Sequence, residues 1–131
     1  MLTRKEAIEF CLTFPGTYED YPFDDMNWTV MRRKDTKHGF CWIYEHNGQL
    51  CINLKNAPDW GELRRRIYPS VLPAYHMNKE HWSTVLLDGT VPEEELEAMI
   101  AESYRLCGKP KRSGPAKTDA APSREKGGQP E

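Results

Sequence analysis

The stretch HGFCWIYEHNGQLCINLK, residues 38–55, decides the fold of this chain. Asn47-Gly48 near its centre supplies the two positive φ angles that a two-residue type I′ turn requires. Aromatic and β-branched residues flank the turn on both sides, as they do in paired strands. The stretch therefore predicts an antiparallel hairpin in which Cys41 lies opposite Leu54 and Ile43 lies opposite Ile52.

Side chains alternate between the two faces of a strand, so this hairpin has one apolar face and one mixed face. The apolar face, which we expect to form the core, carries Cys41, Ile43, Leu50, Ile52 and Leu54. The mixed face carries Phe40, Trp42, Tyr44, Cys51, Asn53 and Lys55. Its aromatic and polar character leaves three interpretations open: a solvated face, a face covered by another element, or a binding surface.

Upstream of the hairpin, the sequence predicts a helix, a loop and a strand. Thr3 and Glu6 have the spacing of a capping box, and apolar residues follow at helical spacing as far as Pro15-Gly16. Residues 17–25 are rich in Tyr, Pro and acids, and we expect them to form a loop. Residues 28–33 predict a short strand.

Downstream of the hairpin, Pro58-Asp59 begins a second helix that ends at Tyr68-Pro69. The apolar stripe of this helix consists of Trp60, Leu63 and Ile67, and such a stripe normally faces the core. The run Arg64, Arg65 and Arg66 is spread around the remaining circumference, where arginines are most simply solvated.

A second hairpin follows, with strands at residues 72–78 and 81–87 that are joined near Lys79-Glu80. The last helix begins at Pro92, has three glutamates in its first turn, and ends at Gly108. The expected order of elements is α-β-β-β-α-β-β-α. An antiparallel sheet with helices packed on one face makes this an α+β fold.

Composition divides the chain into one domain, residues 1–107, and a disordered C-terminal tail, residues 108–131. The tail has no Leu, Ile, Val or aromatic residue to bury. Its six Lys or Arg against three acids give it a charge of +3, which leaves −5 on the domain out of the formal net −2. A domain that binds duplex DNA normally shows a basic surface, and the average charge of this one shows none.

No segment stays apolar over the roughly 20 residues that a membrane-spanning helix needs. The N-terminal residues lead into an amphipathic pattern, so we expect a cytoplasmic protein with no membrane partner. Cys11, Cys41, Cys51 and Cys107 are far apart and form no C-x-x-C pair. This spacing predicts reduced thiols in place of disulfides or zinc ligands.

Two strings of residues carry a family resemblance. They are Pro73-Ala74-Tyr75-His76-Met77-Asn78-Lys79-Glu80-His81-Trp82 and Leu87-Asp88-Gly89-Thr90-Val91-Pro92. Together with Pro15-Gly16, Trp28 and residues 51–55, they make residues 1–107 resemble the MmcQ/YjbR family. The resemblance implies a compact α+β fold similar to that of secretion chaperones. It also implies DNA binding through a double-wing arrangement, with the Asn47-Gly48 hairpin as one wing.

We expect no enzyme activity. The residues that could serve a reaction, His76, His81, Asp88, Cys51 and Tyr75, match no nucleophile elbow, phosphate loop or metalloprotease motif. The four histidines are scattered, and each adjacent Glu-His pair would point to opposite faces of a strand. We therefore expect no metal and no cofactor.

Binding is the expected function, with DNA or RNA as the first candidate partner. The candidate phosphate contacts are Arg32, Arg33, Lys55, Arg64, Arg65 and Lys79; Asn78 and His76 could reach polar base edges, and Trp42 or Tyr44 could stack on bases. The aromatic residues could equally be cross-strand packing. The competing function is a protein-interaction module, chaperone-like or dimerising, that uses an uncovered aromatic sheet face.

Overall fold

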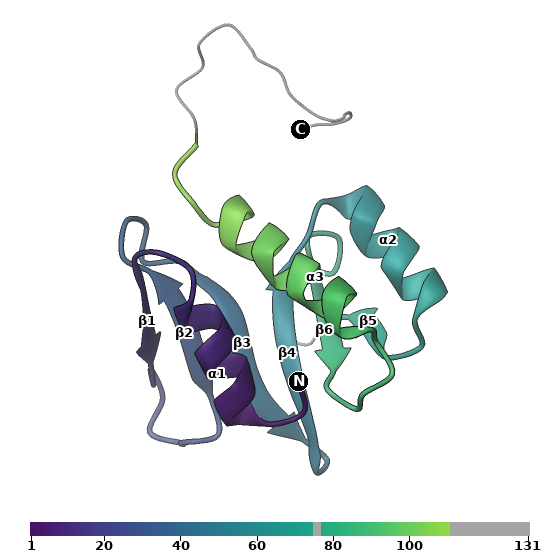
Figure 1. Ribbon diagram of the computed structural model, residues 1–131, viewed down its shortest axis with the longest axis horizontal. Helices are drawn as coiled ribbons and strands as arrows, with labels where there is room; N and C mark the ends of the chain where they lie inside the picture. Colours follow the sequence, from purple (N-terminus) through teal and green to yellow (C-terminus); the bar gives the residue numbers. More distant parts are fainter. Residues whose placement is uncertain (75–76, 111–131) are drawn as a thin grey trace, which may run out of the picture.

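The computed structural model describes residues 1–74 and 77–110 (Figure 1). Its helices are α1 (Arg4–Leu12), α2 (Pro58–Ile67) and α3 (Glu93–Leu106). Its strands are β1 (Thr17–Asp20), β2 (Thr29–Arg33), β3 (Gly39–His46), β4 (Gln49–Lys55), β5 (Val71–Pro73) and β6 (Trp82–Leu86). His76 and most of the expected tail, residues 111–131, lie outside the described residues.

The strands form one antiparallel sheet in the order β1-β2-β3-β4-β6-β5. Helices α1 and α3 cover one face of it, and α2 packs beside the β5 edge (Figure 1). The main core lies between the sheet and these helices and includes Ala7 and Cys11 of α1 and Met99 and Ile100 of α3. This arrangement confirms the predicted α+β class.

The central hairpin forms as predicted. Cys41 pairs with Leu54 and Ile43 pairs with Ile52, and the turn residues have positive φ angles of 52° at Asn47 and 78° at Gly48. The predicted capping box at the start of α1 is also present. The hairpin and the capping box agree with the prediction because a short local pattern of residues determines each of them.

The prediction for Phe40 is wrong. The register between β2 and β3 shifts next to Met31, and this irregularity turns Phe40 onto the helix-covered face. Phe40 is fully buried there, and its ring packs edge-on against Phe14 and Tyr104 at centroid distances of 6.1 and 5.2 Å. The mixed face of the hairpin is therefore less apolar than strict alternation predicts.

Two predicted segment boundaries are also wrong. Residues 17–20, expected in a loop, form the edge strand β1, which pairs with β2 from Thr17↔Arg33 to Asp20↔Val30. An edge strand buries little and therefore lacks the apolar alternation that identifies a strand in a sequence. The strand expected at residues 72–78 is only Val71–Pro73, because the chain leaves the sheet after Pro73.

Helix α2 buries a different side from the predicted one. Its buried residues are Gly61 and Arg64, while the apolar stripe of Trp60, Leu63 and Ile67 is exposed. The guanidinium of Arg64 contacts two carboxylates of α3, at 2.9 Å from Glu95 and 2.5 Å from Glu102. Gly61 faces Asn56 so closely that an added Cβ would come within 2.3 Å of the Asn56 amide nitrogen. A buried ion cluster and a close backbone approach therefore fix the inner side of this helix.

Candidate nucleic-acid interface

Two connections of the sheet leave from the same end. The turn at residues 34–38 joins β2 to β3, and the connection at residues 74–81 joins β5 to β6. The strand register places both at one end, because Lys55, the last residue of β4, pairs with Trp82, the first residue of β6. The C-terminal end of α3 also lies here, since Ser103 Oγ donates to the carbonyl of Phe40 at 2.6 Å.

The turn at residues 34–38 is held against the last turn of α3. Thr36 Oγ1 donates to the carbonyl of Cys107 at 2.8 Å, and Arg33 Nη1 donates to the carbonyl of Tyr104 at 2.7 Å. The Arg33 guanidinium also lies over the Tyr104 ring, 4.0 Å from its centroid. Both hydrogen bonds satisfy carbonyls at a helix C-terminus that have no partner within the helix.

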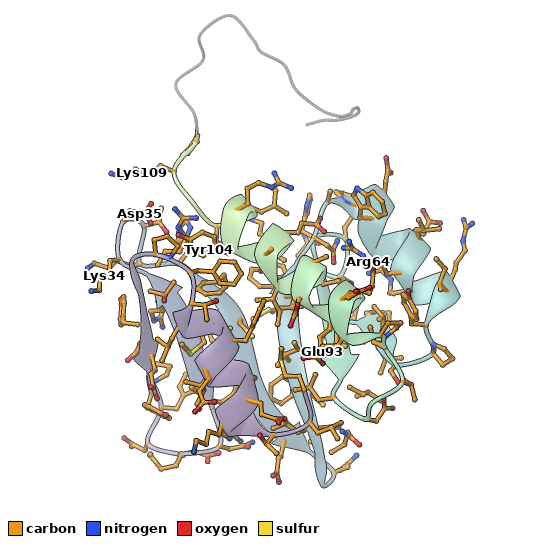
Figure 2. The ribbon with its side chains drawn as sticks, in the orientation of Figure 1. Lys34, Asp35, Arg64, Glu93, Tyr104 and Lys109 are labelled. Carbon is orange, nitrogen blue, oxygen red and sulfur yellow. The ribbon has the colours of Figure 1, made fainter. Side chains whose placement is uncertain are left out.

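Basic side chains gather around these segments, and we call them the basic end: Lys34, Lys37, Lys79, Arg105 and Lys109. All five are exposed, and within residues 1–74 and 77–110 none of them forms an ion pair with an acid. Figure 2 shows Lys34 and Lys109 on the same side of the molecule, close to Asp35 and Tyr104. The exposed His38 and His81 lie on the same two connections.

Asp35 and Glu80 are acids on the two connections at this end; Glu80 lies 3.9 Å from His81, and Arg33 neutralises Asp35. The Arg33 guanidinium donates two hydrogen bonds to Asp35, from Nε to Oδ1 at 3.0 Å and from Nη2 to Oδ2 at 2.9 Å. These hydrogen bonds and the nearby positive charges of Arg33 and Lys109 lower the pKa of Asp35. Because Arg33 already neutralises Asp35, the positive charges of Lys34, Lys37 and Lys109 are not balanced by that carboxylate.

The opposite end of the sheet is acidic. The acidic end comprises Asp24, Asp25, Glu45, Asp88, Glu93 and Glu94. It contains the turn at Asn47-Gly48, the connection from β1 to β2 and the start of α3, where Glu93 is labelled in Figure 2. Of the cations there, Arg4 donates to the carbonyls of Asn27 and Ile43, and Lys5 lies 4.0 Å from Glu9.

Three arginines that the sequence proposed as phosphate contacts already have partners. Arg64 is buried between Glu95 and Glu102, as described above. Arg65 donates to Ser83 Oγ at 2.8 Å. Arg32 forms an ion pair with Asp20 at 2.7 Å and also donates to the carbonyl of Lys37 at 3.0 Å. The structure brings none of the three to the surface as a free cation.

The proposed stacking residues Trp42 and Tyr44 are parts of a packed cluster. Trp28 stacks on Tyr44 with 4.2 Å between the ring centroids, and Trp42 meets Trp28 edge-on at 6.5 Å. The Tyr44 hydroxyl donates to Asn53 Oδ1 at 2.8 Å, and Tyr44 is only 2% exposed. The Trp42 indole donates to the carbonyl of Gly39, and the Arg32 guanidinium lies over its ring. The packing interpretation therefore accounts for both aromatic residues.

The remaining proposed residues that the structure describes lie at the basic end or beside it. Lys79 is exposed, and Lys55 is half-buried at the end of β4. Asn78 Oδ1 accepts from the amides of Glu80 and His81 at 2.9 and 3.3 Å, which makes it a residue that shapes the connection. Of the proposed set, Arg32 and Arg33 also contact the β2–β3 turn, but each is paired with an acid, whereas Lys55 and Lys79 form no ion pair among the described residues.

The described part of the chain contains neither a metal-binding cluster nor a membrane-spanning helix. In residues 1–74 and 77–110, no group of three or more His, Cys, Asp or Glu side chains is arranged to hold a metal ion. Within the same residues, no helix has both the length and the apolar character needed to cross a membrane. Cys11, Cys41, Cys51 and Cys107 are all buried free thiols.

A protein-family model described as YjbR matches residues 12–106. The chain belongs to the YjbR family. It is 32% identical over 104 residues to the uncharacterized protein YjbR of Escherichia coli strain K12. The aligned region covers 79% of this chain and 86% of that protein. It is also 32% identical over 117 residues to the uncharacterized protein YyaQ of Bacillus subtilis strain 168, covering 81% and 98%, respectively.

Solved structures share the YjbR fold. The crystal structure of Deinococcus radiodurans protein DR2400, with a domain named DUF419, has a TM-score of 0.72 and 36% identity, covering 81% of this chain and 78% of that one. A Pseudomonas syringae protein has a TM-score of 0.72 and 31% identity, covering 82% and 100%. These matches confirm the family resemblance seen in the sequence.

In this YjbR domain, sequence reasoning missed Lys34, Lys37, Arg105 and Lys109. The charge of −5 on residues 1–107 concealed the first three, because the acids that balance them lie at the other end of the sheet, and Lys109 was counted with the tail. A usable signal was present in the sequence: Lys34 and Lys37 flank a turn, and Arg105 and Lys109 flank the end of a helix. Side chains at turns and helix ends usually extend into solvent, whereas a side chain in the middle of a helix, such as that of Arg64, can be buried.

Proposed function

We propose that this YjbR domain is a nucleic-acid-binding protein that contacts phosphates with its basic end. The observation that carries the proposal is the set of exposed lysines and arginines on three separate segments at one end of the sheet. Lysine and arginine neutralise backbone phosphates, and this contribution supplies most of the non-specific affinity for DNA. The acidic end, which repels the same polyanion, orients the domain.

The two connections at the basic end are the wings in this proposal. The β2–β3 turn carries Lys34 and Lys37, and the β5–β6 connection carries Lys79, with the C-terminal end of α3 between the two. The Asn47-Gly48 turn leaves the sheet at the acidic end, so we replace it as a wing with the β2–β3 turn. Because Thr36 and Arg33 anchor that turn to α3, its lysines are presented on a supported loop.

The proposed role is binding without a catalytic step. The alternative of a protein-interaction surface on the aromatic sheet face loses its support, because Phe40 is fully buried and Tyr44 is 2% exposed. The basic end supports contacts to phosphates and not to particular bases, so the proposal is for binding of low sequence selectivity.

Fluorescence anisotropy of a labelled DNA duplex, measured at several salt concentrations, tests the proposal. We expect binding at low salt and a linear fall of log K with log salt, with a slope of about −3 to −5 for four or five phosphate contacts. Absence of binding at low salt would reject the proposed function. Cleavage of the duplex during the titration would contradict the non-catalytic part of it.

A further inference from the structure

Helix α2 presents apolar side chains to solvent. Trp60, Leu63 and Ile67 are 52%, 42% and 54% exposed, and they follow one another along one side of the helix. Single apolar residues on a protein surface are common, but three in line on one helix form a continuous apolar surface. We call this surface the α2 stripe.

The stripe cannot be buried by rotation of α2 within the domain. The side of α2 next to the stripe holds Arg64, which is 8% exposed, is bonded to Glu95 and Glu102 of α3 and lies over the Trp60 ring, 5.0 Å from its centroid. Rotation would leave these buried charges without partners, which is strongly unfavourable. The α2 stripe is therefore a fixed external surface of the folded chain.

The charges beside the stripe have a self-complementary order. Asp59 and Glu62 lie in the N-terminal half of α2, and Arg66 lies in the C-terminal half. Glu62 and Arg66 are 64% and 72% exposed, and their ion pair within the helix spans 3.1 Å. Two copies of α2 packed antiparallel would place the acidic half of each against the basic half of the other.

The same antiparallel arrangement matches the apolar residues. An axis of two-fold symmetry near Leu63 brings Leu63 against its own copy and Trp60 against Ile67 of the other copy. A surface that pairs with itself about a two-fold axis is the requirement for a symmetric dimer. We infer that the α2 stripe binds a second copy of this chain in an antiparallel helix pair. This inference does not rest on nucleic-acid binding.

The dimer is weak. A helix of 10 residues contributes much less than the roughly 800 Å² that each partner buries in an interface of standard size. We expect a dissociation constant on the order of 0.1 mM, which corresponds to about −5.5 kcal/mol. The interface therefore operates at high local concentration, as when several copies lie next to one another on one polymer.

Sedimentation equilibrium of the full chain, from about 10 µM to about 1 mM, spans the transition expected for so small an interface. We expect monomer at the lowest concentration and dimer, with no larger species, at the highest. Leu63→Glu places two carboxylates at the symmetry axis and is expected to weaken the dimer at least about tenfold. The matched control is Leu12→Glu, because Leu12 of α1 is 44% exposed and Leu63 is 42% exposed.

A charge exchange tests the antiparallel orientation without altering the apolar residues. In an antiparallel homodimer, Glu62→Lys would set a lysine against Arg66 of the other copy, and Arg66→Glu would set a glutamate against Glu62 of the other copy, so each variant alone is expected to stay monomeric. An equimolar mixture of the two restores opposite charges across the interface and is expected to form a heterodimer. Thermal denaturation of each variant establishes that it is folded.

Three results would overturn the inference. The first is a full chain that stays monomeric to about 1 mM, which leaves the stripe to another partner or to solvent. The second is a dimer that Leu63→Glu and Leu12→Glu weaken equally. The third is a mixture of the Glu62→Lys and Arg66→Glu variants that associates no better than either variant alone.

Discussion

The two ends of the sheet differ in charge although the same six strands supply both. At one end, the β2–β3 turn, the β5–β6 connection and the end of α3 carry Lys34, Lys37, Lys79, Arg105 and Lys109. At the other end, the β1–β2 connection, the β3–β4 turn and the start of α3 carry mainly acids. An antiparallel sheet sends successive connections to opposite ends, so its topology separates charges that a sum over the sequence averages.

This difference shows that net charge is a poor guide to the partner of a small domain. A polyanion responds to the local potential at the surface it approaches, and at physiological salt that potential extends only about 8 Å. The acidic end therefore does not cancel the basic end. It confines polyanion binding to one orientation of the molecule.

Reversing charges at the basic end is expected to produce the largest effect. The variant Lys34→Glu/Lys37→Glu removes two phosphate contacts and adds two repulsive charges, so its affinity for duplex DNA at low salt should fall at least about tenfold. Fluorescence anisotropy measures this affinity. The residues beyond Pro110 are the same in the variant and the parent, so their charges contribute equally to both.

The matched control is Lys5→Glu, which is compared with Lys34→Glu alone because each single change alters the net charge by the same amount. Lys5 is on α1 near the acidic end, 4.0 Å from Glu9. We expect its affinity to stay within about twofold of the parent protein at the same salt. Equal losses in the two variants would mean that overall charge, and not the basic end, governs binding.

Loosening the β2–β3 turn should have a smaller effect, since it moves cations without removing them. Thr36→Val removes the donor to the Cys107 carbonyl and should lower the free energy of unfolding by about 1 kcal/mol. It should also weaken DNA binding, by about twofold. Thr90→Val, which removes a 2.7 Å hydrogen bond to Asp88 at the acidic end, should destabilise similarly with no change in affinity. Urea denaturation and anisotropy separate the two effects, and identical affinities for the two variants would contradict the role of the tether.

The smallest expected effect is on the pKa of one carboxylate at each end of the sheet, Asp35 at the basic end and Asp88 at the acidic end. Hydrogen bonds from Arg33 lower the pKa of Asp35, whereas the pKa of Asp88 is lowered chiefly by the Ser70 hydroxyl. Each carboxylate therefore adds stability above the ordinary Asp pKa of about 3.9, and this stability is lost as the pH falls through its lower folded value.

A change in salt concentration should shift the pKa values of the two carboxylates by different amounts. Screening weakens the attraction of a charged guanidinium more than it weakens a hydroxyl hydrogen bond, so high salt should raise the pKa of Asp35 more than that of Asp88. Carboxyl-carbon NMR titrations at low and high salt measure both values. An equal response of the two groups would contradict the assignment of the Asp35 shift to Arg33.

The sequence predicted the features that depend on neighbouring residues. The hairpin turning at Asn47-Gly48 and the capping box at Thr3 each follow from a few consecutive side chains. The orientation of α2 could not be predicted in this way, because the partners of Arg64 are on α3, more than thirty positions along the chain. Phe40 was assigned to the wrong face because a local register shift breaks the alternation of side chains.

The basic end was beyond prediction for a related reason. Lys34, Lys79 and Lys109 belong to three segments that only the sheet order and the position of α3 bring to one end. The lysines at turns were visible in the sequence, but their common location was not. The arginine run at 64–66 was more conspicuous there, yet two of its three members are bonded inside the protein, to Glu102 and Ser83.

Mapping the surface that contacts DNA is the most direct test of the central claim. Backbone amide NMR spectra of the full chain, recorded during titration with a short duplex, report contacts residue by residue. We expect shifts concentrated at residues 34–38, 78–81 and 105–109, with little change at residues 45–48 and 93–97. Shifts concentrated at the acidic end, or no shifts at low salt, would contradict the assignment of the basic end as the nucleic-acid interface.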